Sequence, residues 1–162
     1  MAYNVLEVCR HIINYSNKKD YGISNLKLQK ILYFVQAYFL IISDGERPCF
    51  NEKIEAWDFG PVVPKAYHEF KKYGSGDIPT ITTILVREDE NDIWNFDRMP
   101  YLDDKITRQD KGKIDAVVDL FSDYSATDLV TLTHQQSPWK DVYVRHKNNE
   151  IEQKKILEYF NG

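Results

Sequence analysis

The segment IEAWDFGPVVP, which begins at Ile54, constrains the fold more than any other part of the chain. Apolar and polar residues alternate over residues 54–59, and this pattern predicts a strand with one buried face. Gly60 and Pro61 predict the end of that strand, because proline has no N–H to give to a sheet and glycine readily adopts positive φ. Pro64 suits the first turn of a helix. We therefore expect a strand, a rigid turn and the start of a helix.

A second constraint is the apolar run at residues 31–42, which predicts a central and largely enclosed helix. Ser24 or Asn25 is a suitable N-cap for it, because a short polar side chain there can accept a bond from a free backbone N–H. The run has about twelve residues and is too short to span a bilayer. The polar residues of the first turns are expected to face solvent: Lys27, Gln29 and Lys30.

Gln36 lies inside this apolar run, and a buried amide needs hydrogen-bond partners. We expect it to bond Trp57 or the backbone of Gly60, which would tie the helix to the strand. A pocket or partner groove at Gln36 is the alternative. Trp57 itself is expected to be largely buried against the face of the helix that carries Tyr33 and Gln36.

The rest of the chain predicts further helices and short strands. Further strands or extended segments are expected at residues 49–50, 80–86 and 93–96, with an irregular region at Met99-Pro100 and Asp103-Asp104. Further helices are expected at residues 4–16 and 64–73, and after the N-caps Thr107, Ser125 and Asn149. The expected fold is mainly α, of the α+β class. It is a single compact domain over residues 1–162, with about six helices around the central apolar one and a few short β-strands.

Composition places the chain among ordinary globular proteins, with 43% hydrophobic and 28% charged residues. The formal net charge of −4 argues against nucleic-acid binding over the whole surface. Cys9 and Cys49 are the two cysteines, and their spacing indicates neither a metal site nor a redox pair. Glu7 and Arg10 interrupt any N-terminal apolar run, so no leader is expected and the protein is expected in the cytoplasm.

The sequence carries weak signals for catalysis. His134 could be a general base, but no motif places a nucleophile beside it, so we expect it to bond a backbone carbonyl and pack against Trp139. The other histidines are scattered and do not predict a zinc site. Gly74-x-Gly76 lacks the lysine and the strand–helix context of a phosphate loop. We expect no enzyme activity, no cofactor and no metal.

Three sequence blocks together resemble a known family. They are residues 26–38 (LKLQKILYFVQAY), the segment at residues 54–64, and residues 129–134 (LVTLTH) followed by Pro138-Trp139. In this order they resemble the Panacea domain of the SocA-like antitoxin family, which includes many phage-associated proteins. The resemblance covers nearly the whole chain, and three blocks in the right order make it fairly specific.

The resemblance implies an antitoxin that neutralises a cognate protein toxin by direct contact, the toxin usually being encoded by an adjacent gene. In one branch of the family the antitoxin also delivers its toxin to a protease. No segment is left over for a DNA-binding motif, so direct nucleic-acid binding and self-repression are not expected, nor is a membrane partner. The alternatives are a phage or mobile-element protein that binds a host factor, and a small enzyme that uses His134.

The convergence of the three blocks predicts an aromatic partner-binding surface, because aromatic anchors supply much of the binding energy at protein interfaces. Its candidate residues are Tyr33, Gln36, Trp57, Phe59, Pro61, His134 and Trp139.

Overall fold

The computed structural model describes residues 2–86, 97–100 and 105–162. The helices within this part of the chain are α1 (Val5–Lys18), α2 (Asn25–Ile42), α3 (Pro64–Phe70), the 3₁₀ helix η1 (Lys71–Tyr73), α4 (Arg108–Leu120), α5 (Ala126–His134), α6 (Ser137–Lys140) and α7 (Gln153–Phe160). The strands are β1 (Ile54–Trp57), β2 (Gly60–Val62), β3 (Thr83–Val86), β4 (Asp97–Pro100) and β5 (Glu150–Ile151). The mainly α, α+β class is confirmed. No described helix has the length and apolar character needed to cross a membrane.

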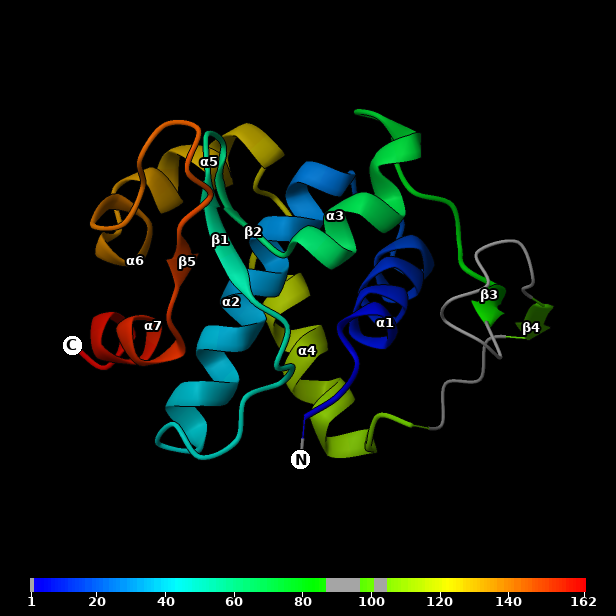
Figure 1. The fold of residues 1–162 in the computed structure, drawn as a ribbon. Helices are drawn as coiled ribbons and strands as arrows, with labels where there is room; N and C mark the ends of the chain where they lie inside the picture. The colour runs from blue at the N-terminus through cyan, green and yellow to red at the C-terminus, as the bar shows by residue number, and fades with distance from the viewer. Residues whose placement is uncertain (1, 87–96, 101–104) are drawn as a thin grey trace.

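Helix α2 is the central element, and it packs against α1, α3, α4, α5, α7 and β2 (Figure 1). Every residue from 28 to 40 is buried except Tyr38. Ser24 is the N-cap, and its hydroxyl accepts a bond from the backbone N–H of Lys27. The central helix and one of its two candidate caps are therefore confirmed.

The predicted end of the strand at Gly60-Pro61 is wrong. The chain turns at Asp58-Phe59 and returns as β2, with Trp57 opposite Gly60 and Ala56 opposite Pro61. Pro61 is tolerated because β2 lies at the sheet edge, in the order β2-β1-β5, and Ala56 N–H points the other way, to the Asn149 carbonyl at 2.8 Å.

Gly60 allows this turn to sit close to the central helix. Its φ is +106°, and a Cβ there would lie 2.8 Å from both Lys30 Cε and Thr133 Oγ1. Any larger residue would therefore meet strain as well as a clash.

Of the three other N-caps predicted from the sequence, at Thr107, Ser125 and Asn149, the structure confirms two. The Thr107 side chain accepts from Asp110 N–H, and Ser125 with Asp128 forms a full capping box. The third prediction is wrong, because the Asn149 side chain donates to the Val142 carbonyl and Glu152 precedes α7 without a side-chain cap.

The β3–β4 hairpin lies at the edge of the molecule beside α1 (Figure 1). β3 falls inside the predicted strand at residues 80–86. Met99-Pro100, expected in an irregular region, belongs to β4, where Met99 pairs with Ile84. The predicted strand at residues 93–96 and the acidic pair Asp103-Asp104 lie outside the described residues.

A charged network joins the N-terminus to α4. Asp110 accepts bonds from Arg47, at 2.5 and 3.1 Å, and from the Tyr3 hydroxyl. The Arg47 guanidinium holds the pKa of the Asp110 carboxyl well below its usual range. Lys113 also bonds Asp110, at 3.2 Å, so paired charges stabilise the first turns of α4.

Gln36 makes the fold-specifying contact that its burial requires, but with a different segment from the one expected. Its Nε2 donates to the Phe50 carbonyl at 2.7 Å, and its Oε1 accepts from the N–H groups of Cys49 and Phe50 at 2.9 and 3.3 Å. The Gln36 amide thus bonds backbone groups of the segment that leads into the sheet. Neither Trp57 nor Gly60 is its partner.

Gln36→Leu should lower the free energy of unfolding by about 2–4 kcal/mol, because the substitution leaves buried backbone groups of Cys49 and Phe50 without partners. Urea denaturation would measure the change. Gln109→Leu on the exposed side of α4 is the matched control and should stay within about 0.5 kcal/mol of the wild type. A loss at Gln36 no larger than the loss at Gln109 would contradict this assignment.

Candidate partner-binding surfaces

Three stacked rings from α5, α6 and the loop that follows hold the β1–β2 turn. His134 stacks on Trp139 with centroids 4.1 Å apart, and Trp139 stacks on Tyr143 at 4.5 Å. The Trp139 indole N–H donates to the Trp57 carbonyl at 2.8 Å, His134 Nε2 donates to the Asp58 carbonyl at 3.0 Å, and the Tyr143 hydroxyl donates to the Asp58 carboxylate. His134 therefore has the structural contacts expected of it, a backbone carbonyl and Trp139.

The seven candidate surface residues do not form one exposed surface. β1, β2 and the turn between them form a hairpin, called the hairpin from here on. Phe59 at its tip is 65% exposed. Trp57 and His134 are half-buried. The expectation that the others would be available to a partner needs correction, because packing against α2 and around the sheet buries their side chains: Tyr33, Gln36, Pro61 and Trp139.

Trp57 also differs from expectation. It is half-buried and packs against α3, with its ring 5.0 Å from Tyr67 and 6.2 Å from His68, whereas the face of α2 that carries Tyr33 was expected. Its indole N–H donates to Glu55 at 2.9 Å. The reason is the pleat, because the neighbouring Ile54 and Ala56 take the inward-facing positions of β1.

Beside the hairpin tip lies a hollow of about 300 Å³ between α2, α3 and the loop before β5. Phe59, Trp57 and Tyr67 form aromatic walls, and the loop contributes His146 and Asn148. The last two have positive φ, +68° and +49°, which costs energy for residues other than glycine.

Lys30 and Gln29, expected at an exposed face, are buried. The Lys30 ammonium nitrogen donates to the Pro61 carbonyl at 2.9 Å, and Gln29 Oε1 accepts from Val63 N–H at 3.0 Å. Burial lowers the pKa of Lys30 to about 7. The two side chains hold β2 against α2, so their role is to place the hairpin.

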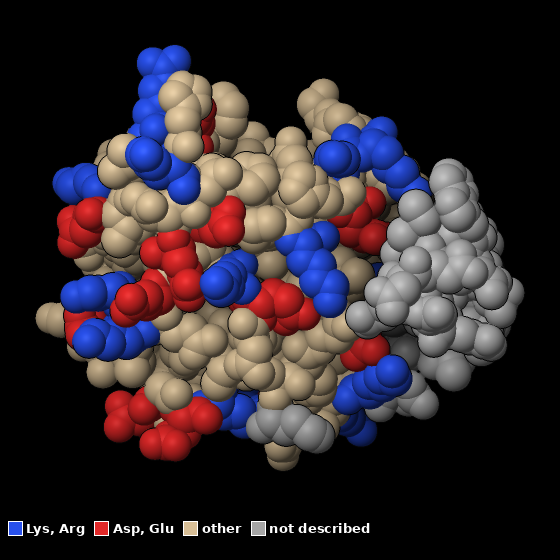
Figure 2. Space-filling view, in the orientation of Figure 1, with Lys and Arg blue, Asp and Glu red and all other residues tan. Residues whose placement is uncertain are grey.

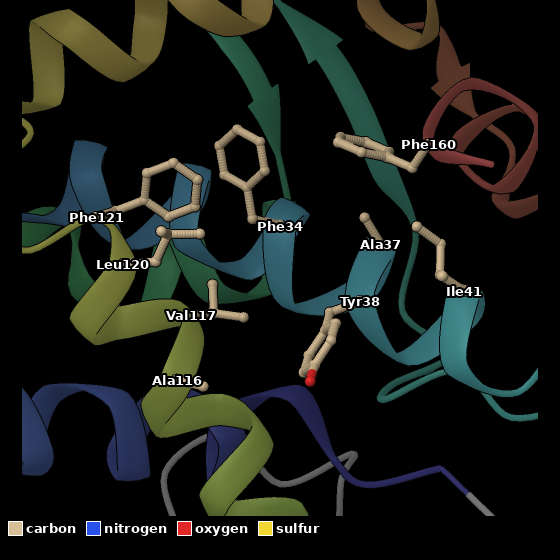
Figure 3. A pocket seen from close by; sticks show the side chains of 9 residues that line it. All are labelled: Phe34, Ala37, Tyr38, Ile41, Ala116, Val117, Leu120, Phe121 and Phe160. Atoms are coloured by element: carbon tan, nitrogen blue, oxygen red, sulfur yellow. The ribbon is translucent and has the colours of Figure 1, made fainter. Parts of the chain in front are cut away.

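An apolar groove of about 420 Å³ lies between α2, α4 and α7 (Figure 3). Phe34 forms part of its floor, stacked on Phe121 at 4.4 Å. Leu120 and Tyr38 stand at the rim and are 68% and 38% exposed. None of the lining residues carries a charge: Phe34, Ala37, Tyr38, Ile41, Ala116, Val117, Leu120, Phe121 and Phe160.

At one end of the groove lies a second, more polar hollow of about 440 Å³, in which Tyr124 and Leu132 stand beside Asp123 and Asp128. The two hollows adjoin through Phe121 and Tyr124, whose rings are 5.2 Å apart. The sequence interpretation missed this surface. Leu120 follows Val117 at i+3 on α4, so the apolar stripe of this helix is wider than its core contact needs, and that is the signal that could have found the surface.

The electrostatics give no single-sign field on the face in Figure 2, where basic and acidic side chains are interspersed. Within the described ranges, no group of three or more His, Cys, Asp and Glu side chains could hold a metal ion. Burial raises the pKa of both thiols, at Cys9 and Cys49, which makes them poor nucleophiles.

The family model described as "Antitoxin SocA-like, Panacea domain" matches residues 28–140. The chain is also similar to "Antitoxin SocA" of Caulobacter vibrioides, strain NA1000 / CB15N, with 51% identity over 55 residues. That alignment spans 34% of this chain and 28% of the relative. No solved structure matches significantly.

The burial of Lys30 predicts a pH-dependent stability. Its folded pKa is about 7, whereas the unfolded amine titrates near pH ~10.4. Between these values the unfolded chain binds a proton that the folded protein does not, so the free energy of unfolding rises with pH by about 1.4 kcal/mol per unit. From about pH 7.5 to 9.5 the wild type should gain about 2–3 kcal/mol relative to Lys30→Met or Lys30→Gln.

Urea denaturation at the two pH values measures this difference. Lys18→Met, at an exposed lysine, is the control and should follow the wild type. Parallel pH profiles for the wild type and both Lys30 variants would show that the buried amine does not titrate in this window.

Proposed function

The chain belongs to the SocA-like antitoxin family and contains its Panacea domain, and from this premise we propose that it neutralises a protein toxin by direct, stoichiometric binding. The matched residues 28–140 include α2 and the hairpin. α1 and α7 lie outside that range but pack on α2, which supports treating them as parts of the same unit.

The observation that carries the proposal is the apolar groove with Leu120 at its rim. Exposed apolar surface of this kind is a protein-contact feature, because burying it against a partner releases the water that covers it. Leu120 and Tyr38 supply the exposed anchors, and the buried Phe34–Phe121 stack keeps the floor of the groove in a fixed shape. Such a preformed surface binds at a lower entropic cost than a flexible one.

The net charge of −4 favours a toxin with a basic surface, since complementary potentials speed encounter. Binding in the cytoplasm, to the product of an adjacent gene, fits the proposal. Delivery of the bound toxin to a protease is compatible with it and would be a second step.

Contact is favoured over catalysis because His134 is committed to the Asp58 carbonyl and to the Trp139 stack. A general base needs a nucleophile or substrate proton within hydrogen-bond reach of its unprotonated ring nitrogen, here Nδ1, and among the described residues no hydroxyl or thiol is hydrogen-bonded to that atom. The ring here supports the hairpin, and that role accounts for its position without a reaction.

Titration tests the proposal directly. The gene next to this one would be expressed and its product assayed for growth arrest and for binding to the purified chain. We expect rescue that saturates near equimolar amounts, and loss of binding in Leu120→Asp with retained folding. Val144→Asp, at an exposed apolar residue away from the groove, is the matched control. Rescue at a small fraction of the toxin concentration would point to an enzyme and end this proposal.

The substitution His134→Asn distinguishes a structural role of this residue from a direct role in neutralisation. Because the ring supports the hairpin, the substitution should lower the free energy of unfolding by about 1 kcal/mol and leave neutralisation intact at permissive temperature. The two readouts are the melting temperature and the toxin titration. Neutralisation that disappears while the melting temperature is unchanged would instead place His134 in the function itself.

A further inference from the structure

The apolar groove has a shape that selects a kind of partner segment. Along α2 its lining runs from Phe34 to Ile41, seven positions further along the chain, and at 1.5 Å per residue this is about 10 Å, or two turns of a helix. A helix laid in such a groove presents apolar side chains at i, i+4 and i+7 over the same length. The dimensions therefore match one apolar stripe of a short helix.

The walls of the groove exclude a strand as its occupant. All of its lining residues come from helices or from the residue that ends one, and an added strand would need an open sheet edge to pair with. A small molecule fits poorly as well, since binding pockets for such ligands place a few polar groups to fix orientation, and the nine lining residues include one hydroxyl, that of Tyr38.

The charged residues beyond Phe121, at one end of the groove, favour a partner with basic residues. Asp123 and Asp128 are exposed beyond Phe121. The cation facing them is Lys27, which is half-buried and whose ammonium lies 3.4 Å from the Ser122 carbonyl. Among these three described groups, two exposed carboxylates thus stand against one partly withdrawn cation, which favours a basic partner residue.

Away from that end, Lys113 of α4 already bonds Asp110. On α7, Lys155 pairs with Glu158 at 3.6 Å. Asp123 and Asp128 therefore offer two exposed carboxylates to a basic residue of a partner.

We infer that this groove binds an amphipathic helix whose apolar stripe covers about two turns and which carries Lys or Arg at the end that reaches Asp123 and Asp128. The inference rests on the proposed function in one respect, that the helix belongs to the toxin. The chemistry of recognition stands on the groove itself. Apolar burial gives the affinity, and the carboxylates favour basic residues at the end of the helix that reaches them.

A labelled peptide tests the recognition without the toxin. The probe is an amphipathic helical peptide of about 14 residues, with leucines at i, i+4 and i+7 and two arginines at one end. A second peptide has two glutamates in place of the arginines. Fluorescence anisotropy at about 0.05 M salt should show tighter binding of the arginine peptide, by roughly five-fold or more, and the preference should shrink at about 0.3 M salt.

Groove variants locate the binding. Leu120→Asp, and Ala116→Gln, which fills the groove without adding charge, should each weaken the arginine peptide at least about ten-fold. The double variant Asp123→Lys/Asp128→Asn should reverse the preference between the two peptides. Asparagine is chosen at 128 because it can still accept the capping bond from Ser125. Val144→Asp and Asp141→Lys, both at exposed residues elsewhere, are the controls and should leave binding unchanged.

Circular dichroism and melting temperatures would confirm that each variant is folded. The inference is overturned if neither peptide binds saturably, if the two bind equally at low salt, or if Leu120→Asp and Ala116→Gln have no effect. Sedimentation that shows a wild-type dimer dissociated by Leu120→Asp would also overturn it, because a second copy of the chain would then occupy the groove. Peptide recognition without toxin binding would refute the proposed function alone, and equimolar toxin binding that ignores the groove variants would refute this inference alone.

Discussion

The arrangement of the whole molecule depends on three polar side chains of α2 that are buried and bonded to the backbone of the segment that follows. Gln36 pairs with the backbone of Cys49 and Phe50, Lys30 with the Pro61 carbonyl, and Gln29 with Val63 N–H. A buried backbone group without a partner is costly, so these bonds fix the path of residues 49–63 along the helix. They act as a template for the sheet, which is too short to define its own register.

One consequence is that the two sides of α2 have different roles. The side that faces the hairpin is closed by hydrogen bonds and then covered by the His134, Trp139 and Tyr143 rings, which hold the turn through Asp58 and Trp57. The side that faces α4 and α7 is closed mainly by apolar packing, with the Lys27 bond to the Ser122 carbonyl lying beyond the end of α4. Apolar packing has no fixed directions, so this side can leave a gap, and the groove beside Leu120 is that gap.

The sequence predicted the elements that depend on local chemistry. Ser24, Thr107 and Ser125 cap helices as expected, because a cap needs one side chain and an N–H two or three residues away. It did not predict the buried Lys30, since a lysine near a helix start is ordinarily solvated and its partner Pro61 is 31 residues distant. The hairpin was missed for the same kind of reason, because the edge position that tolerates Pro61 is a property of the assembled sheet.

The sequence also failed to predict which of the candidate surface residues are exposed, because exposure depends on the assembled fold. Aromatic residues at blocks that resemble a family are expected at an interface, yet Tyr33 is wholly buried, with its hydroxyl bonded to Gln136 at 2.8 Å. Of the two exposed residues at the groove rim, Leu120 lies outside all three blocks, whereas Tyr38 lies in the first. The blocks that carry the family resemblance therefore build the scaffold and the α2 wall of the groove, whereas the α4 and α7 walls lie outside them. A binding protein built in this way could change its partner by substitution at Leu120, Tyr124 or Asp123 without disturbing the hydrogen bonds that hold the fold, because those bonds lie on the other side of α2.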